Sequence, residues 1–221
     1  EDAGPRTLSN WAAFNPGPGE AGQAASAYLI SNLTNPGLFA VAPSVSADGT
    51  LTYTTAANAS GSSTFQVRVR DGGGTANGGG DTSPAQTITL TIASVNDAPT
   101  VNLGPAPTIN EDALPQNVSA FASFNAGPGE SSQSLLGYVI SNISDPSFFA
   151  VQPTVSNTGV LSYRVAPNAH GTVTFSVQAR DNGGTANGGL DLSGPPTATI
   201  TVNAINHAPS FSAAQPPPRN E

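Results

Sequence analysis

Acidic side chains recur at a fixed spacing along the chain. Of its fourteen Asp and Glu residues, ten fall into five pairs whose members lie 110 positions apart. The pairs are Glu1/Glu111, Asp2/Asp112, Glu20/Glu130, Asp71/Asp181 and Asp81/Asp191. Carboxylate oxygens, together with Asn side chains and backbone carbonyls, are the ligands that Ca²⁺ takes in sets of roughly six to eight. The acidic pairs therefore indicate a metal site with oxygen ligands.

Each acidic pair also has an interpretation that involves no metal. Glu1 and Asp2, with their copies, fit an exposed edge where charge prevents unwanted strand pairing. Asp71 and Asp181 each follow an arginine and open a glycine-rich loop, so a turn or a local ion pair also explains them. The repeated Gly-Pro-Gly-Glu segment is typical of a turn. Both interpretations remain open at the level of sequence.

Composition excludes several other kinds of function. The chain has no cysteine, which removes thiolate metal sites, cysteine nucleophiles and disulfides. Six basic residues stand against fourteen acids, and the net charge of −8 argues against nucleic acid and against a basic membrane-surface helix. No apolar run is long enough for membrane insertion. His170 and His207 align with Ser60 and Asp97, so neither is repeated, and we predict no enzyme activity.

The spacing of 110 residues extends over the whole chain, which makes it a tandem repeat. Roughly half of the aligned positions are identical, including the loop at residues 73–79 and its copy at 183–189. The final residues align with the start of the second copy, so we expect a third copy to begin there. We predict one repeat at residues 1–98 that lacks its first strand, a second at 99–208, and a tail at 209–221.

Both repeats are predicted to be all-β. In the second copy, five segments are apolar or alternate apolar and polar residues, as half-buried strands do. They lie at residues 136–140, 148–151, 160–165, 172–179 and 197–202. Gly or Pro interrupts every window of about fifteen residues, and no segment shows a sustained helical period. Six or seven short strands in about 100 residues predict two tandem Greek-key β-sandwiches of immunoglobulin-like shape.

The boundary between the copies carries the most specific motifs. Residues 94–99 are Ser-Val-Asn-Asp-Ala-Pro, a Pro-rich stretch follows, and Asn-Glu-Asp at 110–112 opens the second copy. That copy ends with Arg-Asp-Asn-Gly-Gly at 180–184, a strand, and Asn-His-Ala-Pro at 206–209. Over the whole chain, these motifs resemble cadherin-like modules, as in the tandem immunoglobulin-like and cadherin-like repeats of large bacterial surface proteins and adhesins. The resemblance implies a β-sandwich array stiffened by calcium at the joints between modules.

The resemblance also implies which residues bind calcium. Linker residues would meet an acid from the loop of the following module, a glutamate from a module base and polar residues from another apical loop. The implied ligands are Glu1, Asp71, Asn96, Asp97, Glu111, Asp112, Asn125, Glu130, Asp181 and Asp191.

The chain departs from the cadherin pattern in the middle of each module and at the junctions. Residues 54–58 and 164–168 contain no acid, although cadherins carry an acidic cluster there. Ser94 and Ala204 stand where the family has a further Asp, and His207 replaces the junction aspartate of the first copy. Fewer ligands imply fewer or weaker calcium sites than in cadherins.

Three functions are consistent with these observations. The first is a non-catalytic, extracellular spacer: a calcium-stiffened stalk of a bacterial surface adhesin or secreted multidomain protein, whose partners are the neighbouring repeats. The second is a carbohydrate-binding accessory module of a secreted polysaccharide-degrading enzyme, which would need an exposed aromatic row although only 6% of the residues are aromatic. The third is homophilic contact: residues 99–110 would form the first strand of the second repeat, and the tail, a copy of them, would add to an unpaired edge.

Overall fold

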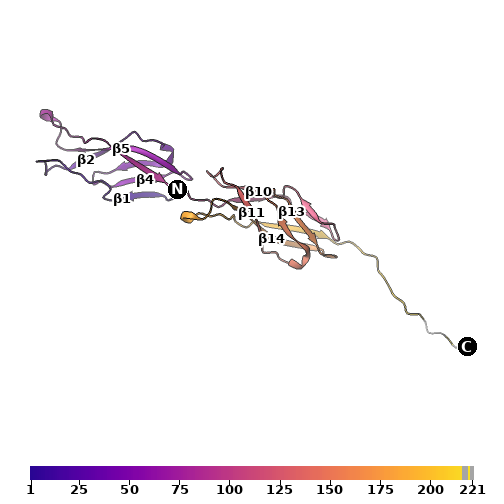
Figure 1. Ribbon diagram of the computed structural model, residues 1–221. Helices are drawn as coiled ribbons and strands as arrows, with labels where there is room; N and C mark the ends of the chain where they lie inside the picture. The colour runs from indigo at the N-terminus through magenta and orange to yellow at the C-terminus, as the bar shows by residue number, and fades with distance from the viewer. Residues whose placement is uncertain (216–218, 220–221) are drawn as a thin grey trace. The chain divides into compact units, whose positions relative to one another are not determined.

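The computed structural model describes residues 1–215 and 219, and these residues form short β-strands joined by turns (Figure 1). The chain divides into two compact units, one formed mainly by Glu1–Asn96 and the other mainly by the chain from Asp97 onward. We call them the first and second modules. None of the described helices has the length and apolar character needed to cross a membrane.

The first module consists of two antiparallel sheets of three strands each. One sheet has the order β1 (Pro5–Leu8), β4 (Leu51–Thr55), β3 (Phe39–Val45). The other has the order β2 (Ala25–Ser31), β5 (Gly61–Asp71), β6 (Gln86–Ile92). Two short 3-10 turns, η1 (Pro36–Leu38) and η2 (Ala76–Gly78), lie in the loops.

The second module repeats this plan and adds strands from its N-terminal segment, residues 100–110, and from residues 122–125. One sheet has the order β12 (Phe149–Val155), β13 (Leu161–Val165), β9 (Gln116–Val118). The other has the order β11 (Leu135–Ser141), β14 (Gly171–Asp181), β15 (Thr197–Asn203), β8 (Thr108–Asn110), with β8 parallel to β15. A two-stranded ribbon pairs β7 (Thr100–Leu103) with β10 (Ala122–Asn125), and the 3-10 turns are η3 (Pro146–Phe148) and η4 (Ala186–Gly188). The single first strand predicted at 99–110 is therefore two strands, because β7 and β8 join different partners.

Alternation of side chains places the core between the two sheets. In β14, Val173, Phe175 and Val177 point inward and are fully buried, and Ile200 of β15 meets them from the neighbouring strand. Polar residues occupy the intervening positions, as expected for sheets with one face in water. The prediction of immunoglobulin-like or cadherin-like β-sandwiches is confirmed.

The first module buries fewer large side chains than the second. Its buried cluster consists of Leu51, Phe65 and Val67, and Trp11 packs against it with its ring centroid 6.5 Å from that of Phe65. In the second module Phe121 takes the place of Trp11 and is almost completely buried.

One glycine in each module allows a close backbone approach. Gly159 has φ 77°, and a Cβ atom there would lie 2.0 Å from the carbonyl oxygen of Ala122. Its own carbonyl accepts the N–H groups of Phe121 and Ala122 at 2.9 and 3.2 Å. Gly49 repeats the arrangement in the first module, where the Ala12 carbonyl oxygen would lie 1.9 Å from such a Cβ atom. Only glycine fits these turns, which attach the β3–β4 and β12–β13 hairpins to earlier segments of the chain at Ala12 and at residues 121–122.

Candidate functional site at the module poles

Three polar side chains gather at one end of the first module, which we call its apical pole. Asn15, Glu20 and Asp71 line one pocket of about 180 Å³, together with Val69 and Thr82. Asp71 is the last residue of β5, and the other two lie on the loop between β1 and β2. The fold therefore brings together two carboxylates and one amide from segments about fifty residues apart in the sequence.

Local turns hold a side-chain oxygen of Asn15 and one of Asp71 in place. Asn15 Oδ1 accepts the Gly17 N–H at 3.0 Å, and Asp71 Oδ1 accepts the Gly73 N–H at 2.8 Å. Such side-chain turns hold the carboxylate or amide in one orientation relative to its loop. Glu20 follows a turn in which Gly17 and Gly19 have φ values of 97° and 81°, a region that glycine adopts readily.

The second module repeats these turns at the positions predicted from its sequence. Asn125 Oδ1 accepts the Gly127 N–H at 3.0 Å, and Asp181 Oδ1 accepts the Gly183 N–H at 2.9 Å. Asp181 is only 1% exposed and Glu130 is buried as well, whereas their counterparts in the first module are half-buried and exposed. The predicted residues Asn125 and Asp181 thus keep the local turns of the apical pole, whereas Glu130 differs from Glu20 in its burial.

The opposite end of the first module, its base, uses acids as acceptors for the backbone. Glu1 Oε1 accepts the Val95 N–H at 3.0 Å, just beyond the end of β6. Asp2 Oδ1 accepts the Asn58 N–H at 3.0 Å, in the loop between β4 and β5. The predicted ligand Glu1 therefore has a structural task of its own, because it ties the outgoing chain to the start of the module.

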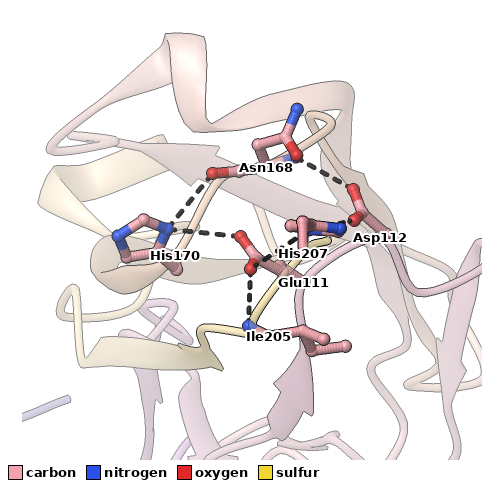
Figure 2. Close-up of polar contacts among 6 residues, drawn as sticks. All are labelled: Glu111, Asp112, Asn168, His170, Ile205 and His207. Carbon is pink, nitrogen blue, oxygen red and sulfur yellow. Dashed lines mark hydrogen bonds and ion pairs between the residues drawn. The ribbon is translucent and has the colours of Figure 1, made fainter. Parts of the chain in front are cut away.

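The base of the second module has the same arrangement, which we call the base clamp (Figure 2). Glu111 Oε1 accepts the Ile205 N–H at 2.5 Å, and Asp112 Oδ1 accepts the Asn168 N–H at 2.9 Å. Glu111 is only 4% exposed, so its interpretation as an exposed edge charge is wrong. A buried carboxylate is tolerated because a backbone N–H satisfies it.

Two histidines join the clamp in the second module only. His170 Nδ1 lies 3.2 Å from Glu111 Oε2, and His207 Nε2 lies 3.2 Å from Asp112 Oδ2 and 3.6 Å from Glu111 Oε1 (Figure 2). Sequence reasoning missed this role because neither histidine is repeated and His170 is 59 residues from Glu111. The alignment of His207 with the junction residue Asp97 was the one available signal.

Of the remaining predicted ligands, Asp191 lies beside Asp181, whose N–H donates to the Asp191 carbonyl at 3.0 Å, and Asn96 and Asp97 lie in the linker. Asp191 Oδ2 lies 3.7 Å from Arg180 Nε, and Asp81 pairs with Arg70 at the same distance. Both arginines are about half exposed, so these ion pairs contribute little to stability. In the linker, Asn96 is buried and Asp97 half-buried.

The donor atoms of the apical pole fit a hard cation in part. Within residues 1–215 and 219, no three His, Asp or Glu side chains form a group that could hold a metal ion. At the pole, two carboxylates and an amide face one pocket, and these are oxygen donors of the kind that Ca²⁺ prefers. Backbone or water oxygens would have to supply the rest of the coordination shell.

Comparison with known proteins agrees with the fold. Residues 20–91 match the model of the bacterial Ig domain family. Two crystal forms of human protocadherin-24 EC1-2 superpose with a TM-score of 0.50 at 17% identity, over 83% of this chain and 82–83% of theirs. No curated protein sequence is significantly similar to the chain.

The two tandem modules have an immunoglobulin-like or cadherin-like fold, and residues 20–91 of the first are similar to a bacterial Ig domain. At this level of identity the protocadherin likeness shows the fold alone. Cadherin-like and bacterial Ig-like repeats are typically extracellular and are generally non-catalytic.

Proposed function

We propose that these cadherin-like repeats form an extracellular spacer, stiffened by calcium, in the stalk of a bacterial surface adhesin or a secreted multidomain protein. The observation that carries the proposal is the apical pole, where Asn15, Glu20 and Asp71 line a single pocket. The same residue types recur at the same positions of the second module, on the same local turns. A repeated oxygen-donor set suits an array in which every module binds the same ion.

The proposed calcium ligands differ in what they already do. At the apical poles, one oxygen of each Asn and Asp is held by a turn, so these groups are oriented before a cation arrives. At the bases, Glu1, Glu111 and Asp112 accept backbone N–H groups, and a bound cation would share them. Asn96 and Asp97 remain proposed linker ligands. Bound calcium would neutralise the carboxylates and fix their loops, which is the source of the proposed stiffness.

A spacer fits the described surface better than a carbohydrate-binding module does. Stacking platforms for sugars require exposed aromatic side chains. Among residues 1–215 and 219, the exposed large apolar side chains are nearly all aliphatic, and Phe211 is the one aromatic residue in that group. We therefore propose the spacer function rather than the carbohydrate-binding one.

A calcium titration with matched charge variants tests the proposal. The double variant Asp71→Asn/Asp181→Asn removes one apical carboxylate from each module, and Asp48→Asn makes the same change at an exposed turn. Calcium at about one hundred times its Kd should stabilise the wild type by roughly 2.7 kcal/mol, because it binds only the folded state. The Asp48→Asn variant should respond like the wild type, and the double variant should lose most of the response in calorimetric melts.

Small-angle scattering with calcium and then with EGTA measures the stiffening itself. When calcium is present, the largest dimension of the particle should increase, and the range of particle dimensions in solution should become narrower. Equal scattering curves in the two conditions, or equal calcium responses of the double variant and Asp48→Asn, would contradict the proposal.

A further inference from the structure

The base clamp of the second module contains both histidines of the chain (Figure 2). His170 lies in the loop between β13 and β14, and His207 follows the end of β15. Although they come from separate segments, their imidazoles approach the same two carboxylates, those of Glu111 and Asp112. The fold therefore gathers two ring nitrogens and two carboxylates at one end of a single module.

The distances in the clamp are longer than those of strong hydrogen bonds. His170 Nδ1 lies 3.2 Å from Glu111 Oε2 and also 3.2 Å from the carbonyl oxygen of Asn168. His207 Nε2 lies 3.2 Å from Asp112 Oδ2 and 3.6 Å from Glu111 Oε1. Hydrogen bonds between an N–H group and a carboxylate, when strengthened by charge, measure about 2.7–2.9 Å. The imidazoles thus approach the carboxylates without forming tight hydrogen bonds.

The same distances match the edges of a tetrahedral metal site. Zinc binds imidazole nitrogen at roughly 2.0–2.1 Å and carboxylate oxygen at roughly 2.0–2.2 Å, usually with four ligands in structural sites. Two ligand atoms of such a tetrahedron lie about 3.3–3.5 Å apart. The separations of 3.2 and 3.6 Å between the imidazole nitrogens and the carboxylate oxygens bracket this range.

The two kinds of side chain in the clamp are suited to different tasks in metal binding. Glu111 Oε1 and Asp112 Oδ1 each accept a backbone N–H, which leaves the second oxygen of each carboxylate beside an imidazole. Hydrogen bonds of this kind orient metal ligands. The side chain of Glu111 is 4% exposed, whereas those of His170 and His207 are 60% and 56% exposed. An ion can therefore enter from solvent, and the imidazoles have room to turn toward it.

The sequence of the first module has oxygen donors at all four corresponding positions. Glu1 and Asp2 repeat the two acids, Ser60 stands in place of His170, and Asp97 stands in place of His207. A set of oxygen donors suits calcium, whereas imidazole nitrogens suit zinc and other transition metals. Both replacements by histidine therefore change the preference of the same site in the same direction.

We propose that the base clamp of the second module binds a zinc ion through His170 Nδ1, His207 Nε2 and one oxygen each from Glu111 and Asp112. As they lie, no three of these side chains could hold one ion, so the exposed imidazoles turn toward a common point when zinc binds. Bound zinc joins the loop before β14 and the segment after β15 to the chain that follows β8. The site goes beyond the proposed calcium function, because the apical poles take no part in it.

Calorimetric titration of the full, metal-free chain with ZnCl₂ tests the proposal. One zinc ion per chain should bind, and an equal concentration of CaCl₂ should not displace it. The variant His170→Ser/His207→Asp carries the residues of the first module and should bind zinc about a hundred-fold more weakly. Asp71→Asn/Asp181→Asn, which removes an apical carboxylate from each module, should bind zinc like the wild type. Failure of the calcium proposal would leave these results unchanged.

Melting curves in EDTA separate loss of the metal site from loss of the fold. Because both imidazoles are more than half exposed, His170→Gln and His207→Gln should melt near the wild-type temperature without metal, and zinc should raise their melting temperature less than that of the wild type.

Cobalt reports the geometry of the site directly. Co²⁺ bound in place of zinc should give the intense visible absorption of tetrahedral coordination. The weak absorption of octahedral Co²⁺ would overturn the four-ligand set. Equal zinc affinities of the wild type and His170→Ser/His207→Asp, or displacement of zinc by equimolar calcium, would overturn the proposal as a whole.

Discussion

Replacing Glu111 with alanine should lower the melting temperature of the second module markedly. The carboxylate accepts the Ile205 N–H at 2.5 Å and lies 3.2 Å from His170 Nδ1, in a position that is 4% exposed. A hydrogen bond to a charged group contributes about 1.5–3 kcal/mol. We therefore expect a loss of about 2 kcal/mol, which corresponds to a decrease of roughly 9 °C in the melting temperature of a domain of this size.

Differential scanning calorimetry in EGTA measures this loss, and two controls define it. Glu111→Gln keeps an oxygen that can accept the Ile205 N–H, so it should lose less than half as much stability. Glu20→Ala makes the alanine change at an exposed position and should leave the melting temperature nearly unchanged. Hydrogen exchange should also become faster at the Ile205 amide in Glu111→Ala. If Glu111→Ala melts at the same temperature as Glu20→Ala, the base clamp does not stabilise the module. The same conclusion follows if the Ile205 amide of Glu111→Ala exchanges at the wild-type rate.

Two further predictions concern turns. Gly159→Ala should destabilise the second module by about 3 kcal/mol in urea unfolding. The reason is that the new Cβ atom would lie 2.0 Å from the Ala122 carbonyl oxygen. Gly194→Ala is the control and should have little effect, because a Cβ atom at Gly194 meets no neighbouring atom. Hydrogen bonds from the Ser46 hydroxyl and then from the N–H and hydroxyl groups of Thr50 hold the pKa of Asp48 below its ordinary 3.8. A carboxyl group whose pKa is lowered by folding stabilises the folded state at every pH above its pKa in the unfolded chain. Asp48→Asn should therefore be less stable than the wild type at neutral pH. The difference in stability should disappear as the pH falls through the lowered pKa.

The long strands could be predicted from the sequence because their evidence is local. Residues 172–179 and 197–202 alternate apolar and polar side chains, and β14 and β15 include both segments. The ribbon could not be predicted in this way. Residues 12–15 and 122–125 are both short segments ending in Phe-Asn, yet only the second forms a strand, because only it has β7 as a partner. A four-residue strand is decided by its neighbour rather than by its own sequence.

The candidate site likewise has one part that could be predicted from the sequence and one part that could not. The turns of Asn125 and Asp181 follow from a glycine two residues later, which a reader of the sequence can see. The base clamp joins Glu111 to a backbone amide 94 residues away, and no local pattern contains that information. For the same reason, the arginine next to Asp181 suggests an ion pair with it, whereas the fold places Arg180 beside Asp191.

The parallel pairing of β8 with β15 has a mechanical consequence. β8 belongs to the segment that enters the second module and β15 is the last strand before the chain leaves it. Tension along the chain pulls the two strands in opposite directions along their length, so the ladder at Thr201, Val202 and Asn203 is loaded in shear and its bonds must fail together. A hairpin at the same place would open one bond at a time, like a zipper. Such a module resists rupture when the chain is pulled from its two ends.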